Sequence, residues 1–251
     1  MAFILEICAA SVASCIAAAE GGANRIELCD NLLEGGTTPS YGTIAIAREK
    51  VDIDLYPIIR PRGGDFLYSD LEFEVMVKDI ERCKQLGCNG VVTGILTANG
   101  RIDKQRCKIL TALAAPMGVT FHRAFDMTDN PFEALEDIIA TGFERILTSG
   151  ARNTALEGTS LLKDLLIRAN DRIAIMAGSG VRSTNIAQLI KATGITEYHT
   201  TAKAYEESKM EYRNPNVSMG GIPGVPEYGI SVTQQQEVAL IREIGEKTLL
   251  S

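Results

Sequence analysis

Short apolar runs alternate with longer amphipathic segments along most of the chain. Eight runs of five or six residues are rich in β-branched and other apolar side chains and are bounded by Gly, Asp, Asn or Pro, which is typical of buried strands. They are residues 3–7, 25–29, 55–60, 90–95, 118–123, 145–149, 172–177 and 197–201. Helical periodicity lies between and after them, at about residues 11–20, 41–49, 70–86, 103–114, 131–141, 156–169, 183–193 and 232–247. We therefore expect a chain built from repeated β–α units.

Eight β–α units within 251 residues are typical of a (β/α)8 TIM barrel, and we expect a single α/β TIM-barrel domain over residues 1–251. Gly21, Gly87, Gly142 and Gly194 follow four of the helical segments, at the position where glycine commonly ends a helix. A doubly wound open sheet would use the same units and is the alternative fold.

A long connection, at about residues 202–231, precedes the last expected helix. Its glycine- and proline-punctuated part, residues 208–229, is too long to be a simple turn. We expect this segment to cover the barrel mouth or to contact a second subunit in a homo-oligomer.

Composition narrows the class of partner. A formal charge of −7 and a pI near 5.0 argue against nucleic-acid and anionic-membrane partners, because both need a basic surface. No uninterrupted run of about 18 apolar residues is present, so no transmembrane helix is expected. The six cysteines are scattered along the chain, which indicates reduced thiols in a cytoplasmic protein rather than a disulfide framework.

Polar residues gather near the carboxyl ends of the expected strands, which is the end where TIM barrels carry their sites. Glu6 and Cys8 share one face of the first strand, and Glu27 and Cys29 share one face of the second, so we expect both pairs to point into the lumen. The residues expected at the mouth are Glu6, Cys8, Glu27, Cys29, Arg60, Arg62, Thr93, His122, Arg123, Asp126, Thr148, Ser149, Ser179, His199 and Thr201.

The segment FHRAFD, residues 121–126, brings an imidazole, a guanidinium and a carboxylate into six residues. His122 is therefore the leading candidate for a general acid or base. The other catalytic candidates are Glu6, Glu27, Asp126 and His199. Three alternatives stay open: the histidines are hydrogen-bonded structural residues, the carboxylates hold a hard divalent ion, or the carboxylates pair with luminal arginines.

Two loops carry candidates for binding an anion. Residues 58–70, IIRPRGGDFLYSD, offer two guanidinium groups beside a glycine pair, although Arg–Asp pairs that brace the loop explain the same residues. Residues 177–181, AGSGV, follow the seventh strand, where barrels often bind phosphate, and Ser183 is the expected cap of the next helix. The substrate-binding candidates are Arg60, Arg62, Arg123, Ser149, Gly178, Ser179, Gly180 and Thr201.

Some chemistries lack their usual residues. No lysine lies inside an expected strand, so a Schiff-base aldolase has only Lys203, just past the eighth strand, as a nearby candidate. Neither an H-x-H nor an H-E-x-x-H pair occurs, which argues against a catalytic zinc site.

The sequence resembles the CutC family of copper-homeostasis proteins. The similarity extends from the N-terminus to about residue 221 and lies in the blocks LEIC, GGANRIELCD, EGGTTPS, IIRPRGGDFLYSD, VTFHRAFDM, RILTSG, ALEG, IMAGSGV and EYRNPNVSMGG. The resemblance implies a cytoplasmic TIM barrel with a role in copper handling through the cysteines that match Cys8 and Cys29.

Two hypotheses of different classes follow. In the first, Cys8 and Cys29 face each other across neighbouring strands, about 4.8 Å apart, and bind Cu(I), which soft thiolates favour. In the second, the barrel is an enzyme that acts on a small anionic or phosphorylated metabolite, with arginine clamps and His122 as acid or base. The alternative for both cysteines is a purely hydrophobic role in the core.

Overall fold

A computed structural model describes residues 2–217 and 226–250 of the chain. The main sheet consists of β1 (Ile4–Ala9), β2 (Arg25–Leu28), β3 (Asp54–Pro57), β4 (Gly90–Thr93), β5 (Gly118–Phe121), β6 (Arg145–Thr148), β7 (Ala174–Gly178) and β8 (Glu197–Thr200). The helices are α1 (Val12–Glu20), α2 (Tyr41–Lys50), α3 (Asp70–Gln85), α4 (Lys104–Ala114), α5 (Pro131–Ala140), α6 (Thr159–Ala169), α7 (Ile186–Thr193) and α8 (Gln235–Leu249).

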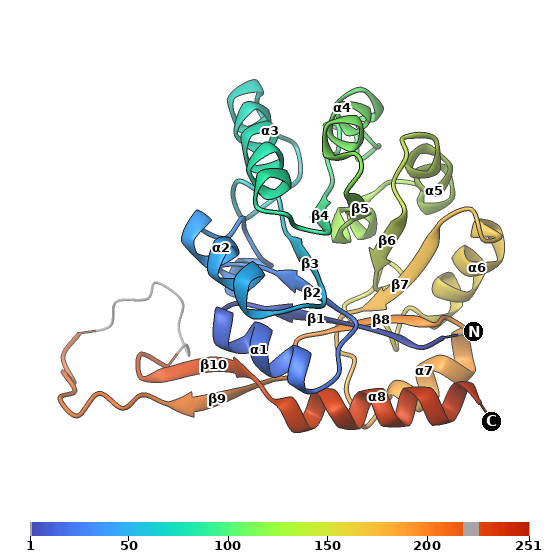
Figure 1. Ribbon diagram of the computed structural model, residues 1–251. Helices are drawn as coiled ribbons and strands as arrows, with labels where there is room; N and C mark the ends of the chain where they lie inside the picture. The colour runs from blue at the N-terminus through green and yellow to red at the C-terminus, as the bar shows by residue number, and fades with distance from the viewer. Residues whose placement is uncertain (1, 218–225, 251) are drawn as a thin grey trace.

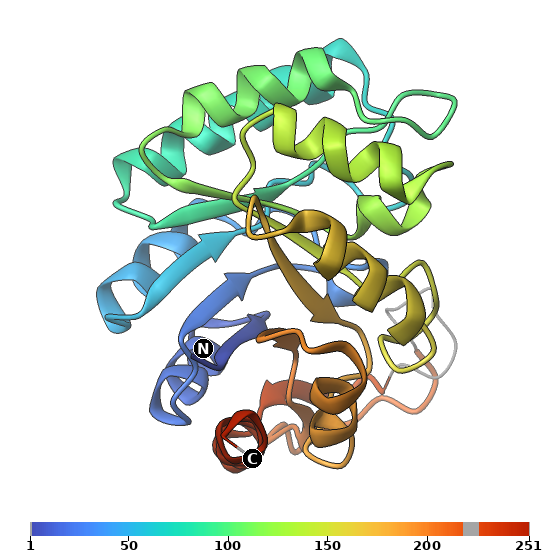
Figure 2. The same cartoon turned by 90° about the vertical axis from the view of Figure 1, so that its right-hand side faces the viewer.

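The eight strands form one parallel sheet in the order β3-β2-β1-β8-β7-β6-β5-β4. An isolated parallel bridge between Ile58 and Val92 connects its two edges, so the sheet nearly closes into a barrel. The helices lie on the outside of this ring (Figures 1 and 2). The prediction of a TIM barrel is therefore confirmed, and the doubly wound alternative is wrong because an open sheet would leave β3 and β4 far apart.

Local sequence signals explain where the helices begin and end. Ser69 and Glu72 form a capping box at the start of α3, each satisfying a backbone N–H of the other residue. Three of the expected stop residues, Gly87, Gly142 and Gly194, adopt the left-handed backbone conformation, which a residue with a Cβ atom rarely tolerates.

The expected cap at Ser183 is wrong. Helix α7 begins only at Ile186, with Asn185 at its N-cap position. The Ser183 backbone N–H and hydroxyl instead both donate to the carboxylate of Glu237 in α8, at 3.0 and 2.9 Å. This contact joins the segment after β7 to the last helix.

The connection before α8 is not a plain loop as expected, because it contains a hairpin. Strands β9 (Lys203–Glu207) and β10 (Gly229–Thr233) pair in antiparallel fashion and extend away from the barrel (Figure 1). Part of the expected segment 208–229, residues 218–225, lies outside the described residues. A homo-oligomer contact through this segment stays a prediction.

Among the described helices, none is long and apolar enough to cross a membrane.

Candidate functional site

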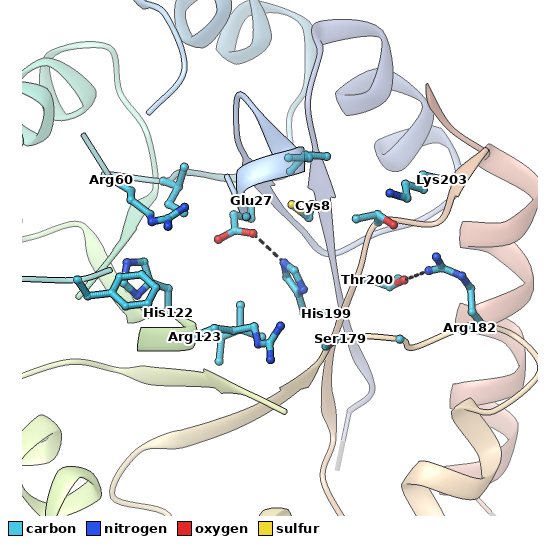
Figure 3. Close-up of a pocket in the computed structure, with 17 residues that line it drawn as sticks. Cys8, Glu27, Arg60, His122, Arg123, Ser179, Arg182, His199, Thr200 and Lys203 are labelled. Atoms are coloured by element: carbon cyan, nitrogen blue, oxygen red, sulfur yellow. Dashed lines mark hydrogen bonds and ion pairs between the residues drawn. The ribbon is translucent and has the colours of Figure 1, made fainter. Parts of the chain in front are cut away.

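A cavity of about 340 Å³ lies at the carboxyl ends of the barrel strands (Figure 3). Its lining comes from most of the strand ends and the loops that follow them. The lining residues are Cys8, Glu27, Leu32, Gly35, Ile58, Arg60, Phe66, His122, Arg123, Leu147, Ser179, Gly180, Arg182, His199, Thr200, Thr201 and Lys203. Many of the residues that strand alternation places at the mouth therefore do meet in one cavity.

Two thiols lie together at one side of this cavity. In the parallel register of β1 and β2, Cys8 is opposite Glu27, and Cys29 follows two residues later. The Sγ atoms of Cys8 and Cys29 are 3.5 Å apart, both residues are buried, and both thiols are free. The hydrogen bond with Cys8 and burial raise the pKa of the Cys29 thiol well above its usual value, so it is protonated at neutral pH.

An ion pair lies beside the two thiols. His199 Nε2 is 2.8 Å from Glu27 Oε2. Burial alone would lower the pKa of His199, but the Glu27 carboxylate raises it well above 6.5. Burial likewise disfavours the ionised form of Glu27, but His199 holds the pKa of this carboxyl group below 4.5. The ligand atoms of Cys8, Glu27 and His199 lie within 4.8 Å of one another, so this cluster can hold a metal ion.

His122 and Arg60 form the opposite wall. The Nδ1 atom of His122 accepts a hydrogen bond from the Ala124 backbone N–H, at 3.3 Å. Burial and the nearby Arg60 guanidinium lower the pKa of His122 to about 4, so the imidazole is neutral at pH 7. Arg60 donates from its two terminal nitrogens to backbone carbonyls of Glu34, Gly36 and Gly64 and so braces the loops around it.

The outer rim of the cavity carries three further cationic side chains, Arg123, Arg182 and Lys203. Arg182 donates to Thr200 Oγ1 at 3.0 Å, and Arg123 donates to Asp126 at 2.7 Å. With Arg60 included, four permanently cationic side chains line the cavity, whereas Glu27 is its one carboxylate among the described lining residues. The cavity therefore favours an anion.

Several candidate residues lie outside the cavity lining. Arg62 pairs with Asp65 in its own loop, which is the bracing arrangement left open above, and with Glu72 in the first turn of α3. Glu6 lies deeper in the lumen, where it pairs with Arg25, and its Oε1 is 3.8 Å from His199 Nε2.

Asp126 is fully engaged by its neighbours. Its carboxylate accepts hydrogen bonds from the backbone N–H groups of Ser149 and Ala151, from the Thr148 and Ser149 hydroxyls, and from Arg123. Asp126 and Ser149 therefore stabilise the loop after β6, and neither residue lines the cavity. Gly178 and Cys29 also lie behind the lining, Cys29 directly behind Cys8.

Two of the lining residues that sequence reasoning missed, Arg182 and Phe66, matter most for the chemistry of the cavity. Arg182 directly follows the AGSGV segment, and its position beside an expected anion loop was the signal available for it. Phe66 lies within the segment 58–70, but an aromatic side chain in a loop gives no indication of where its ring points. Lys203, considered above only as a Schiff-base candidate, is a third cationic group at the rim.

Comparison with known proteins relates this geometry to a family. A model described as the CutC family matches residues 3–204. A family protein CutC of Chromobacterium violaceum is 54% identical over 244 residues, which cover 97% of this chain and 98% of that protein. Mouse and human proteins named copper homeostasis protein cutC homolog are each 46% identical over 248 residues, which cover 99% of this chain and 91% of theirs.

Solved structures show the same fold. A CutC protein from Streptococcus agalactiae matches 79% of this chain and 98% of its own, with a TM-score of 0.75 and 38% identity. A thiamine phosphate pyrophosphorylase from Pyrococcus furiosus matches 98% of this chain and 97% of its own, with a TM-score of 0.61 but 13% identity. That second likeness extends to the fold alone.

Proposed function

Because this chain belongs to the CutC family, whose mouse and human relatives are named copper homeostasis proteins, we propose that it binds one Cu(I) ion through Cys8 and Cys29. The observation that supports this most directly is the 3.5 Å separation of two free, buried Sγ atoms. Two soft thiolates on adjacent strands suit monovalent copper better than a hard divalent ion.

The neighbouring groups fit the same role. The side chain of His199 lies close enough to Cys8 to act as a further ligand, provided that Cu(I) displaces the proton that Glu27 stabilises on it. Because the Cys29 thiol is protonated at neutral pH, binding of Cu(I) must displace its proton. Affinity for Cu(I) should therefore rise as the pH increases.

Copper titration tests this proposal. We expect the wild type to take up one equivalent of Cu(I) in competition with a colorimetric Cu(I) chelator, and the Cys8→Ser, Cys29→Ser double variant to lose it. The chain offers a matched control, since Cys83 and Cys88 are a second pair of neighbouring, buried, free thiols away from the cavity. The Cys83→Ser, Cys88→Ser variant should retain the equivalent. Equal binding by both double variants would show that copper binds elsewhere.

A second candidate function is enzymatic action on a small anionic metabolite, and the excess of cationic side chains in the cavity favours it. Arg60→Ala is a poor test, because Arg60 braces three backbone carbonyls and its loss would disturb the loops. Lys203→Gln is better, because Lys203 is an exposed lining residue. Calorimetry should find that inorganic phosphate binds the wild type, that Lys203→Gln weakens this binding, and that Lys191→Gln on the outer helix α7 does not.

A further inference from the structure

Two hydrogen-bond donors in the cavity wall have no partner. Among the described residues, Arg60 Nε and His122 Nε2 are buried side-chain nitrogens without an acceptor, and each residue is only 4% exposed. Both residues line the cavity (Figure 3). An unsatisfied buried donor is costly, so two of them in one wall indicate a place where a bound molecule supplies the acceptor.

The hydrogen bonds around His122 determine which of its nitrogens carries hydrogen. The Ala124 backbone N–H donates to Nδ1, so Nδ1 must present its lone pair. In the neutral imidazole the hydrogen is then on Nε2, the atom without a partner. His122 is therefore built as a neutral donor at this position rather than as a base.

Arg60 complements this donor with charge. Three of its four terminal N–H groups donate to loop carbonyls, which fixes the guanidinium, and its Nε–H has no hydrogen-bond partner. The Phe66 ring packs against both side chains, with its centre 4.8 Å from that of the His122 ring and 5.0 Å from Arg60 Cζ. Phe66 is only half-buried and also lines the cavity, so a movement of its ring would give a ligand access to the two donors.

We propose that Arg60 Nε–H and His122 Nε2–H form a binding site for a carbonyl or carboxylate oxygen of a small organic phosphate, whose phosphate group binds at the rim beside Arg182 and Lys203. This inference rests on the second candidate function and is independent of copper. The ligand then has two ends: a phosphate group held by Arg182 and Lys203, and an oxygen held by the two buried donors. Such donors stabilise an oxygen most when it gains negative charge, as in reactions of carbonyl compounds.

Nuclear magnetic resonance on the wild type tests the donor role without a variant. The chain contains only two histidines, so long-range proton–nitrogen spectra show two imidazoles. We expect one to be neutral with its hydrogen on Nε2 and to shift when 2-phosphoglycolate, which carries both a phosphate and a carboxylate, is added. Inorganic phosphate alone should leave that Nε2 signal in place. A signal that is unmoved by bound 2-phosphoglycolate would overturn the donor site.

Affinities separate the two ends of the ligand. His122→Phe keeps an aromatic ring against Phe66 but removes the donor, so it should weaken binding of 2-phosphoglycolate by roughly tenfold and leave inorganic phosphate unchanged. Lys203→Gln should weaken both, and Lys191→Gln neither. If the wild type binds phosphate and His122→Phe binds 2-phosphoglycolate as tightly as the wild type does, the donor site is refuted but the second candidate function is not. Absence of binding of either compound to the wild type would refute both this proposal and the second candidate function.

Discussion

The lumen of the barrel contains two polar layers, of which the lower is held together by ion pairs and the upper contains buried donors without partners. Near the amino ends of the strands, Arg25 pairs with Glu6 and Glu197, and Arg145 pairs with Glu197 and Glu144. At the mouth, Arg60 and His122 each retain a buried donor without an acceptor. The lower layer therefore stabilises the barrel, whereas the upper layer contains the unpaired donors on which our proposed ligand site rests.

One atom connects the two layers. Glu6 Oε1 is buried without a hydrogen-bond partner and lies 3.8 Å from His199 Nε2, which belongs to the mouth. The luminal network of carboxylates and arginines, left open above as an alternative for Glu6, is therefore present, but its arginine at Glu6 is Arg25 rather than Arg60 or Arg62.

The largest expected effect comes from breaking the lower layer. Arg25→Met removes the arginine partner of the buried Glu6 and one of the two arginine partners of Glu197, and leaving a buried charge uncompensated costs about 3–5 kcal/mol. Urea unfolding measures this loss in the free energy of unfolding. The control is Arg172→Met, which breaks an exposed pair with Glu136 and should cost far less. Similar losses in the two variants would contradict a stabilising role for the lower layer.

We expect an intermediate effect on the free energy of unfolding when a change of pH protonates His122 in the upper layer. The unfolded chain takes up a proton on His122 near pH 6.5, but the folded protein does so only near pH 4. The free energy of unfolding should therefore be fully preserved above pH 6.5, fall as the pH drops towards 4, and level off below it, by about 3 kcal/mol in total. Urea unfolding of wild type and His122→Gln across this range isolates the contribution of His122. A difference between the two proteins that does not change with pH would show that His122 titrates normally.

The smallest effect is expected at Arg62, which lies near Arg60 in sequence but outside the cavity. Its pairs with Asp65 and Glu72 are partly exposed to solvent, and pairs of this kind contribute about 1 kcal/mol or less. Arg62→Ala should therefore lower the melting temperature only slightly and leave phosphate binding unchanged. A loss of phosphate binding in this variant would require Arg62 to reach the cavity.

The fold was predictable because each barrel strand is a compact apolar run bounded by turn residues. Strands β9 and β10 were missed because KAYEE is largely exposed, GISVT is mostly only partly buried, and both carry few residues that indicate a core. Their pairing depends on each other, and residues 208–228 separate them in the sequence.

The sequence predicted which strand residues point into the lumen, but not the level along the barrel axis at which each one lies. Alternation along the strands correctly placed Cys8, Glu27 and His199 in the lumen, where they meet. The same alternation cannot show that Glu6 lies one layer below these residues, because the stagger between neighbouring strands determines the level of each side chain in the barrel. Nor can spacing show which charges pair within a loop, and this is why Arg60 and Arg62 seemed equivalent.

The junction between β3 and β4, the seam at which the barrel closes, affects where the barrel opens locally. Neighbouring strands elsewhere share ladders of two or more residue pairs, whereas β3 and β4 share one bridge, between Ile58 and Val92, supported by hydrogen bonds of Asn89 with Leu55 and of Thr93 with Ile59. Amide hydrogens at this seam should exchange with solvent sooner than those in the centre of β1, because the ladder of paired residues is shorter here. The chain passes from the seam directly into the loop that carries Phe66, so opening of the seam would also move the ring that packs against Arg60 and His122.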